Sequence, residues 1–153
     1  MVNSSNLGVE KIIFGNDSVV IKKHISDIEG GRTLDVAGYP VNNILAGSVV
    51  IKLANGNYAP MPLKALTETV EGASEPTPVL DEDGEQKYGY DALPDGAKYV
   101  GVVYRSISKS NPQASIMFDG VVNEACLPYE ISAIKEAFLK AVPHIVFMQD
   151  EVA

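Results

Sequence analysis

Hydrophobic and polar residues alternate along the chain in short stretches, most of them the length of a β-strand. Lys11 to Ile25 holds two β-branched runs on either side of Gly-Asn-Asp-Ser, a composition that predicts a hairpin of two short strands. Arg32 to Val36 alternates polar with mostly apolar side chains and predicts one more strand.

The clearest hairpin follows. Val49 to Leu53 is rich in β-branched residues, Asn55-Gly56-Asn57 has the composition of a turn, and the return segment is interrupted by Pro60 and Pro62. Proline cannot donate a ladder hydrogen bond, so the return strand is expected to be short.

The C-terminal half predicts two strands, a helix and a closing strand. The strands are expected from Tyr99 to Ile107 and from Ser115 to Leu127. Apolar residues then recur at helical spacing, and Pro143 ends the helix before a short apolar segment, IVF. The helical stripe consists of Ile131, Ile134, Phe138 and Ala141.

Many short strands and one helix, without an internal repeat, predict a mainly β (α+β) fold. We expect a compact β-sandwich or barrel-like body with one C-terminal helix and an extended N-terminal arm. We expect residues 1–15 to form the arm and residues 16–153 to form a single domain. The stretch 68–87 is acidic, contains Pro and Gly, and is almost free of large apolar side chains, which predicts a long surface loop.

Charge and cysteine content narrow the classes of function. Twelve Lys and Arg against twenty Asp and Glu give a net charge of -8, which disfavours nucleic acid as a partner. The one cysteine, Cys126, allows neither an intrachain disulfide nor a cysteine zinc cluster. The N-terminus has no signal-peptide pattern and no run is long enough to span a bilayer, so we expect an unprocessed cytosolic product with no membrane partner.

Candidates for catalysis are few. The bases are His24 and His144, for which a capping or packing role is the favoured interpretation. Cys126 lies in a predicted apolar strand, where burial is the commoner state of a cysteine. No catalytic constellation is visible, so we expect the chain not to be an enzyme.

Cofactor and metal sites are not predicted either. Asp81-Glu82-Asp83-Gly84-Glu85 has the composition of a calcium loop, but with Gly84 in the sixth position the first and twelfth positions fall on Val79 and Tyr90, which carry no carboxylate. Gly30-Gly31 and Gly96 lack the spacing of phosphate-binding loops. The seven tyrosines are interpreted as core or rim residues, and the alternative is that they anchor an interface or stack on sugars and bases. They are Tyr39, Tyr58, Tyr88, Tyr90, Tyr99, Tyr104 and Tyr129.

Three phrases in the C-terminal half are similar to a known family. This part of the chain resembles the tail of phage head-decoration proteins of the lambda D type. In that family, the phrase G-x-V-N-x-x-x-L precedes a helix and a G-I-x-F strand. The corresponding stretches here are YVGVVYRSI, then ASIMFDGVVNEACLPY, a helix and PHIVFMQDE. LAGSVVIKLANGNYAPM resembles the family's AG-x-V-L strand and hairpin, whereas the acidic stretch and the residues before Arg32 depart from it. Gly120, Val122, Asn123 and Leu127 match the first phrase; Ile145 and Phe147 match the last, with His144 in place of glycine.

The resemblance implies a structural virion protein on the exterior of a capsid, made in the bacterial host cytoplasm. Its partners would be the major capsid protein and its own copies, as a homotrimer. An N-terminal arm of this family completes a sheet of the capsid protein, and Ile12, Ile13 and Phe14 would be the apolar plug here.

Two other functions stay open at this point. One is a head-fibre base or surface protein that binds a receptor or glycan through the stretch 68–87 and Tyr88-Gly-Tyr90. The other is a small enzyme or sensor whose site is assembled from Cys126 and His144, and a rapidly alkylated thiol would favour it.

Overall fold

The computed structural model describes residues 17–149. Its elements are mainly short strands, as predicted. In chain order they are α1 (Asp17–Val20), β1 (Ile21–Asp27), β2 (Arg32–Thr33), β3 (Asn43–Ile44), β4 (Val49–Lys52), β5 (Tyr58–Pro60), β6 (Leu63–Ala65), β7 (Thr67–Glu68), β8 (Thr77–Pro78), β9 (Tyr88–Tyr90), β10 (Lys98–Val103), β11 (Ile107–Ser108), β12 (Gln113–Ala114), β13 (Ile116–Asn123), the 3₁₀ helix η1 (Glu124–Cys126), α2 (Lys135–Ala141) and β14 (Ile145–Met148).

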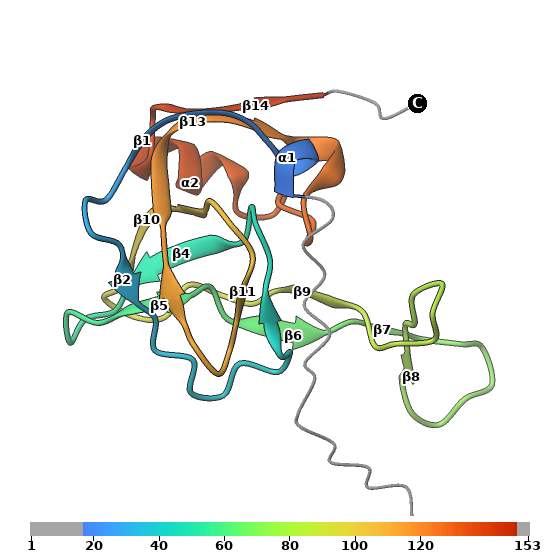
Figure 1. Cartoon of the computed structure of the whole chain (residues 1–153). Coiled ribbons are helices and arrows are strands. Elements are labelled where there is room, and N and C mark those ends of the chain that lie inside the picture. The colour runs from blue at the N-terminus through green and yellow to red at the C-terminus, as the bar shows by residue number, and fades with distance from the viewer. Residues whose placement is uncertain (1–16, 150–153) are drawn as a thin grey trace, which may run out of the picture.

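Six of the strands form the main sheet, and further pairings bend it into a ring (Figure 1). The order is β1-β13-β10-β4-β5, with β14 beside β13. A parallel bridge from Leu34 to Tyr58 joins β5 to the chain after β2, and β2 pairs with β12, which runs into β13. These links therefore return to β13 and leave β1 and β14 outside the ring, and the predicted barrel-like body is confirmed.

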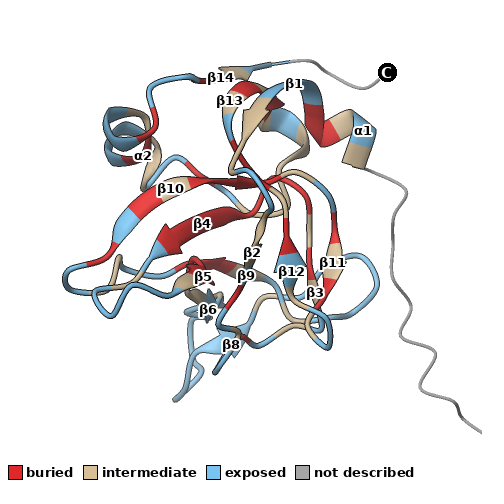
Figure 2. Cartoon of the chain, turned by 60° about the vertical axis from the view of Figure 1, so that its left-hand side comes forward, coloured by how far each residue is buried: buried red, intermediate tan, exposed pale blue. Residues whose placement is uncertain are grey.

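The central strands are buried on both faces because their side chains alternate between two cores (Figure 2). Val50, Val103 and Ile116 point into the ring, where they meet Leu34 and Ala114. On the opposite face, a second set packs under α2 and includes Val49, Ile51, Val102, Met117, Phe138 and Ile145. The β-branched runs read from the sequence thus supply both cores.

The clearest predicted hairpin is confirmed. Ile51 pairs with Ala59 in an antiparallel ladder between β4 and β5, and Asn55 accepts a hydrogen bond from the backbone N–H of Asn57 in the turn. The predicted strand from Tyr99 to Ile107 is shorter than expected, because pairing with β4 and β13 ends at Val103 and β11 pairs with β3 instead.

The predicted C-terminal helix and closing strand are present as α2 and β14. The helix begins at Lys135, later than expected, and its apolar stripe differs at the end. Phe138 is fully buried, but Ala141 is exposed and Val142 takes its place in the core. Pro143 follows at once, and the backbone N–H of Val142 makes the last helical hydrogen bond, to Phe138.

The prediction of a turn in the N-terminal hairpin is wrong, because Asp17–Val20 forms the short helix α1. The sequence had predicted only the C-terminal helix. The second predicted strand is present as β1. The first strand, with Ile12, Ile13 and Phe14, lies outside the described residues. Cys126 is not in a strand as predicted, since β13 ends at Asn123 and gives way to η1.

Replacement of Gly120 by alanine is expected to reduce the free energy of unfolding by about 1–3 kcal/mol. A Cβ atom at this position would overlap the carbonyl oxygen of Lys23 and lie 2.7 Å from the Met117 sulfur, so β1 and β13 would have to separate. Gly89→Ala is the matched control, because its Cβ would meet only the flexible end of the Leu66 side chain, at 3.0 Å. Urea unfolding measures both variants, and equal midpoints would contradict this account.

Candidate functional site

Large apolar side chains are exposed at only two places in the part of the chain that the structure describes. Four lie on the neighbouring strands β1, β13 and β14, and two lie in the stretch 68–87. Exposed apolar side chains that lie next to one another often mark a protein-binding surface. They are Ile25, Phe118, Val146 and Met148 on the strands, and Val70 and Leu80 in the stretch 68–87.

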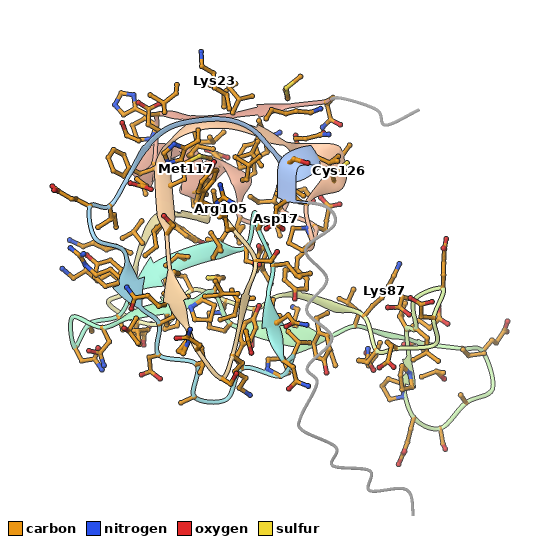
Figure 3. The ribbon with its side chains drawn as sticks, viewed as in Figure 1. Asp17, Lys23, Lys87, Arg105, Met117 and Cys126 are labelled. Atoms are coloured by element: carbon orange, nitrogen blue, oxygen red, sulfur yellow. The ribbon has the colours of Figure 1, made fainter. Side chains whose placement is uncertain are left out.

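The first place is the solvent side of β1, β13 and β14, here called the outer face. In the ladders, Lys23 pairs with Val121, and Val121 pairs with Val146. Paired residues share one side of a sheet, so these three side chains form a row across the strands. Ile145 is buried against the core, and its neighbour Val146 is therefore turned outward and 56% exposed. Figure 3 shows Lys23 pointing away from the body.

Strand β1 is the edge of the main sheet, and its start is fixed to the body. The Asp17 carboxylate accepts hydrogen bonds from the backbone N–H of Ser106, at 2.8 Å, and from its hydroxyl, which itself accepts from the N–H of Ala46. Bulges interrupt the pairing of β1 with β13. Lysines and bulges on an edge strand oppose indiscriminate strand addition, and β1 carries Lys22 and Lys23 together with these bulges.

The second place is the stretch 68–87, here called the acidic loop, which projects from the body beyond β6 and β9 (Figure 1). The predicted surface loop is confirmed, since nearly all of its residues are exposed. It holds seven carboxylates and one lysine, a charge of -6, so the remaining residues of the chain together carry -2. Lys87 lies where the loop returns to the body (Figure 3).

Hydrogen bonds give the acidic loop its shape. Strands β7 and β8 pair at its base, and the amide of Gln86 donates to the carbonyl oxygens of Leu66, Val79 and Lys87. One Asp81 carboxylate oxygen accepts from the N–H groups of Asp83 and Glu85, each at 2.9 Å. This carboxylate organises a turn, and no cluster of metal ligands is found among the described residues.

The residues that carry the family resemblance hold the fold together. Gly120 pairs with Ile145 of β14, a Cβ atom on it would overlap the carbonyl oxygen of Lys23 on β1, and Val122 is fully buried. The Asn123 side chain caps η1 by accepting from the N–H of Ala125, and it donates to the Cys126 sulfur at 3.3 Å. Leu127 packs against the core. The four matched residues thus have structural roles in the packing of β13 and η1.

The structure does not bring the predicted catalytic candidates together. His144 is exposed just before β14, and Cys126 is half-buried in η1, beyond the other end of the β13–β14 ladder. Four paired positions separate them, roughly 10 Å of strand. His24 instead lies 3.2 Å from the Asp27 carboxylate and stacks on Tyr104 at 4.3 Å between ring centroids.

The tyrosines divide into core and surface, and the sequence did not tell which is which. Tyr39 and Tyr90 are buried, and the Tyr90 hydroxyl accepts a hydrogen bond from the N–H of Val49. The Tyr90 and Tyr129 rings meet edge to face at 5.5 Å. Burial raises the pKa of Tyr39 and of Tyr90 well above the ordinary value of 10.0, and nearby Tyr129 adds to both shifts.

Comparison with known proteins gives no relative on which a function could rest. No family model, no curated protein and no solved structure matches the chain. Within residues 17–149, no helix has the length and apolar character needed to cross a membrane. The interpretation of the two surfaces therefore depends on their own geometry and on the sequence resemblance.

Removing the imidazole of His144 is expected to leave the alkylation rate of Cys126 within about twofold of the parent rate, because the two side chains lie at opposite ends of a ladder. The rate constant for iodoacetamide at neutral pH, followed by mass spectrometry, measures this in His144→Ala. A fall of about tenfold or more would favour the cysteine and histidine enzyme instead.

The free energy of unfolding is expected to fall as pH rises above about 10, the pKa of a tyrosine in the unfolded chain. The pKa values of Tyr39 and Tyr90 are raised by folding, so the unfolded chain ionises first and unfolding is favoured as pH rises. Each tyrosine contributes up to about 1.4 kcal/mol per pH unit above that point. Tyr90→Phe should reduce the slope by one such contribution. Urea unfolding of the parent and of Tyr90→Phe at several pH values above about 10 measures it, and equal slopes for the two proteins would contradict it.

Proposed function

We propose that the chain is a structural virion protein that binds the outer surface of a phage capsid and stabilises the mature head. The observation that supports this most is the division of exposed apolar side chains between two separate surfaces, the outer face and the acidic loop. A protein held between neighbours in a lattice uses more than one contact surface, whereas small-ligand sites are concave and apolar.

The sequence resemblance supports the same proposal through the fold. Gly120, Val122, Asn123 and Leu127 occupy positions that fix how β13, β14 and η1 meet, which is what a shared architecture requires. The matched phrases thus concern packing, and the chemistry of a reaction would need other residues. This is consistent with a protein that acts by binding and does not turn over a substrate.

We assign the capsid contact to the arm, residues 1–15. The described residues start at Asp17, which accepts a hydrogen bond from Ser106 and leads through α1 into the edge strand β1. Ile12, Ile13 and Phe14 would add a strand to an exposed sheet edge of the major capsid protein. If the protein binds the expanded lattice and does not bind free capsid subunits, many bound copies would stabilise the head by mass action.

A receptor- or glycan-binding surface protein is the second candidate, and the projecting acidic loop favours it (Figure 1). The aromatic residues that this function was expected to use are less suitable. Tyr90 is buried and accepts a hydrogen bond from β4, and only Tyr88 of the pair is partly accessible. Stacking on a sugar ring requires an exposed aromatic face, so the capsid proposal is preferred.

Full-length protein is expected to co-sediment with expanded, undecorated capsids to a saturating ratio, and a version starting at Asn16 is expected not to. The truncated protein keeps every described contact, and circular dichroism checks that it is folded. Ala137→Glu, an exposed change on α2, is the full-length control and should bind normally. Equal binding of both lengths would remove the role of the arm, and absence of binding by either would remove the capsid proposal and direct attention to a glycan screen.

A further inference from the structure

The outer face and the acidic loop are complementary to each other. We propose that the acidic loop of one copy docks on the outer face of a second copy of this chain. This contact is independent of the capsid, because both surfaces belong to the described body.

Charge supports the pairing. The acidic loop has a charge of -6, and the row on the outer face begins with Lys23, next to Lys22. The carboxylate of Asp27, at the C-terminal end of β1, lies 3.2 Å from the His24 imidazole and accepts a hydrogen bond from the Ser115 hydroxyl at 2.9 Å. Asp119 pairs with Ser26, which lies near the same end of β1 as Asp27. The part of the outer face around Val121 and Val146 lies next to Lys23 and is therefore the part that suits an acidic partner.

Apolar exposure supports it too. Leu80 and Val70 are 54% and 46% exposed in the loop, and Val146 and Ile25 are 56% and 51% exposed on the face. These two places hold all of the large exposed apolar side chains in residues 17–149. Contact between copies would cover both at once, whereas contact of either surface with a purely polar partner would leave them unmatched.

The loop is already shaped for binding. Its base is held by β7 and β8, and its turns are held by Gln86 and Asp81, without a core of its own. A binding element that is ordered before it meets its partner loses less conformational entropy on association. Leu80 is itself held by a bridge to Gln86, so its side chain is displayed at a defined position.

The geometry makes the contact intermolecular. The acidic loop projects sideways from the body, whereas β1, β13 and β14 lie along another side (Figure 1). A loop that points away from its own outer face can reach only that of a neighbour. Each copy then offers one loop and one face, which is a head-to-tail arrangement that closes into a ring or continues as a chain.

Sedimentation velocity of the full chain at increasing concentration tests the contact. The parent protein is expected to associate, with an affinity that falls as salt rises. Val146→Glu, which impairs only the face, and Leu80→Glu, which impairs only the loop, should each weaken association about tenfold or more. Mixed together, they should form a pair that grows no further, because the intact loop of the first fits the intact face of the second.

Ala137→Glu is the matched control, since it adds the same charge at an exposed position of α2, which belongs to neither surface, and it should associate like the parent. Both substituted positions are exposed, so circular dichroism should be unchanged. A parent protein that stays monomeric, a mixture that does not associate, or a loss of association in Val146→Glu but not in Leu80→Glu would overturn the proposal. The last result would indicate a face-to-face dimer.

Discussion

The structure depends on the close approach of backbones around β13. This strand pairs with β1 along one edge, and with β10 and then β14 along the other. Gly101 on β10 and Gly120 on β13 make the approach possible, because a Cβ atom on either would overlap a carbonyl oxygen of the adjoining strand. The ring, the core under α2 and the outer face all meet at this strand, so a change in its spacing would alter all three.

Periodicity predicted the parts of the fold where local sequence and burial agree. The β4–β5 hairpin satisfies both requirements, with β-branched residues buried on two faces and a turn of suitable composition. The start of the chain does not, since Asp17 and Ser18 have turn composition but form a helical turn that is held by the distant Ser106. A contact across 89 positions cannot be read from a local pattern.

Only one of the two candidate surfaces could be predicted from the sequence. The acidic loop was identified by composition alone, because charge and the lack of large apolar residues leave it no core to join. The outer face was not, because Val146 and Ile145 are both β-branched, and only the register with β13 shows which one faces solvent. Likewise, the sequence suggested a site made of Cys126 and His144, but the β13–β14 ladder holds the two residues at its opposite ends.

The concentration of charge in the acidic loop gives the molecule a large permanent dipole moment. Residues 68–87 hold -6 of the chain's total of -8, and they project to one side of a body that is close to neutral. Two copies that approach each other therefore experience a torque within about 10 Å, the range over which charges are felt at moderate ionic strength. Loops repel loops, so encounters are oriented loop to body before any side chains touch.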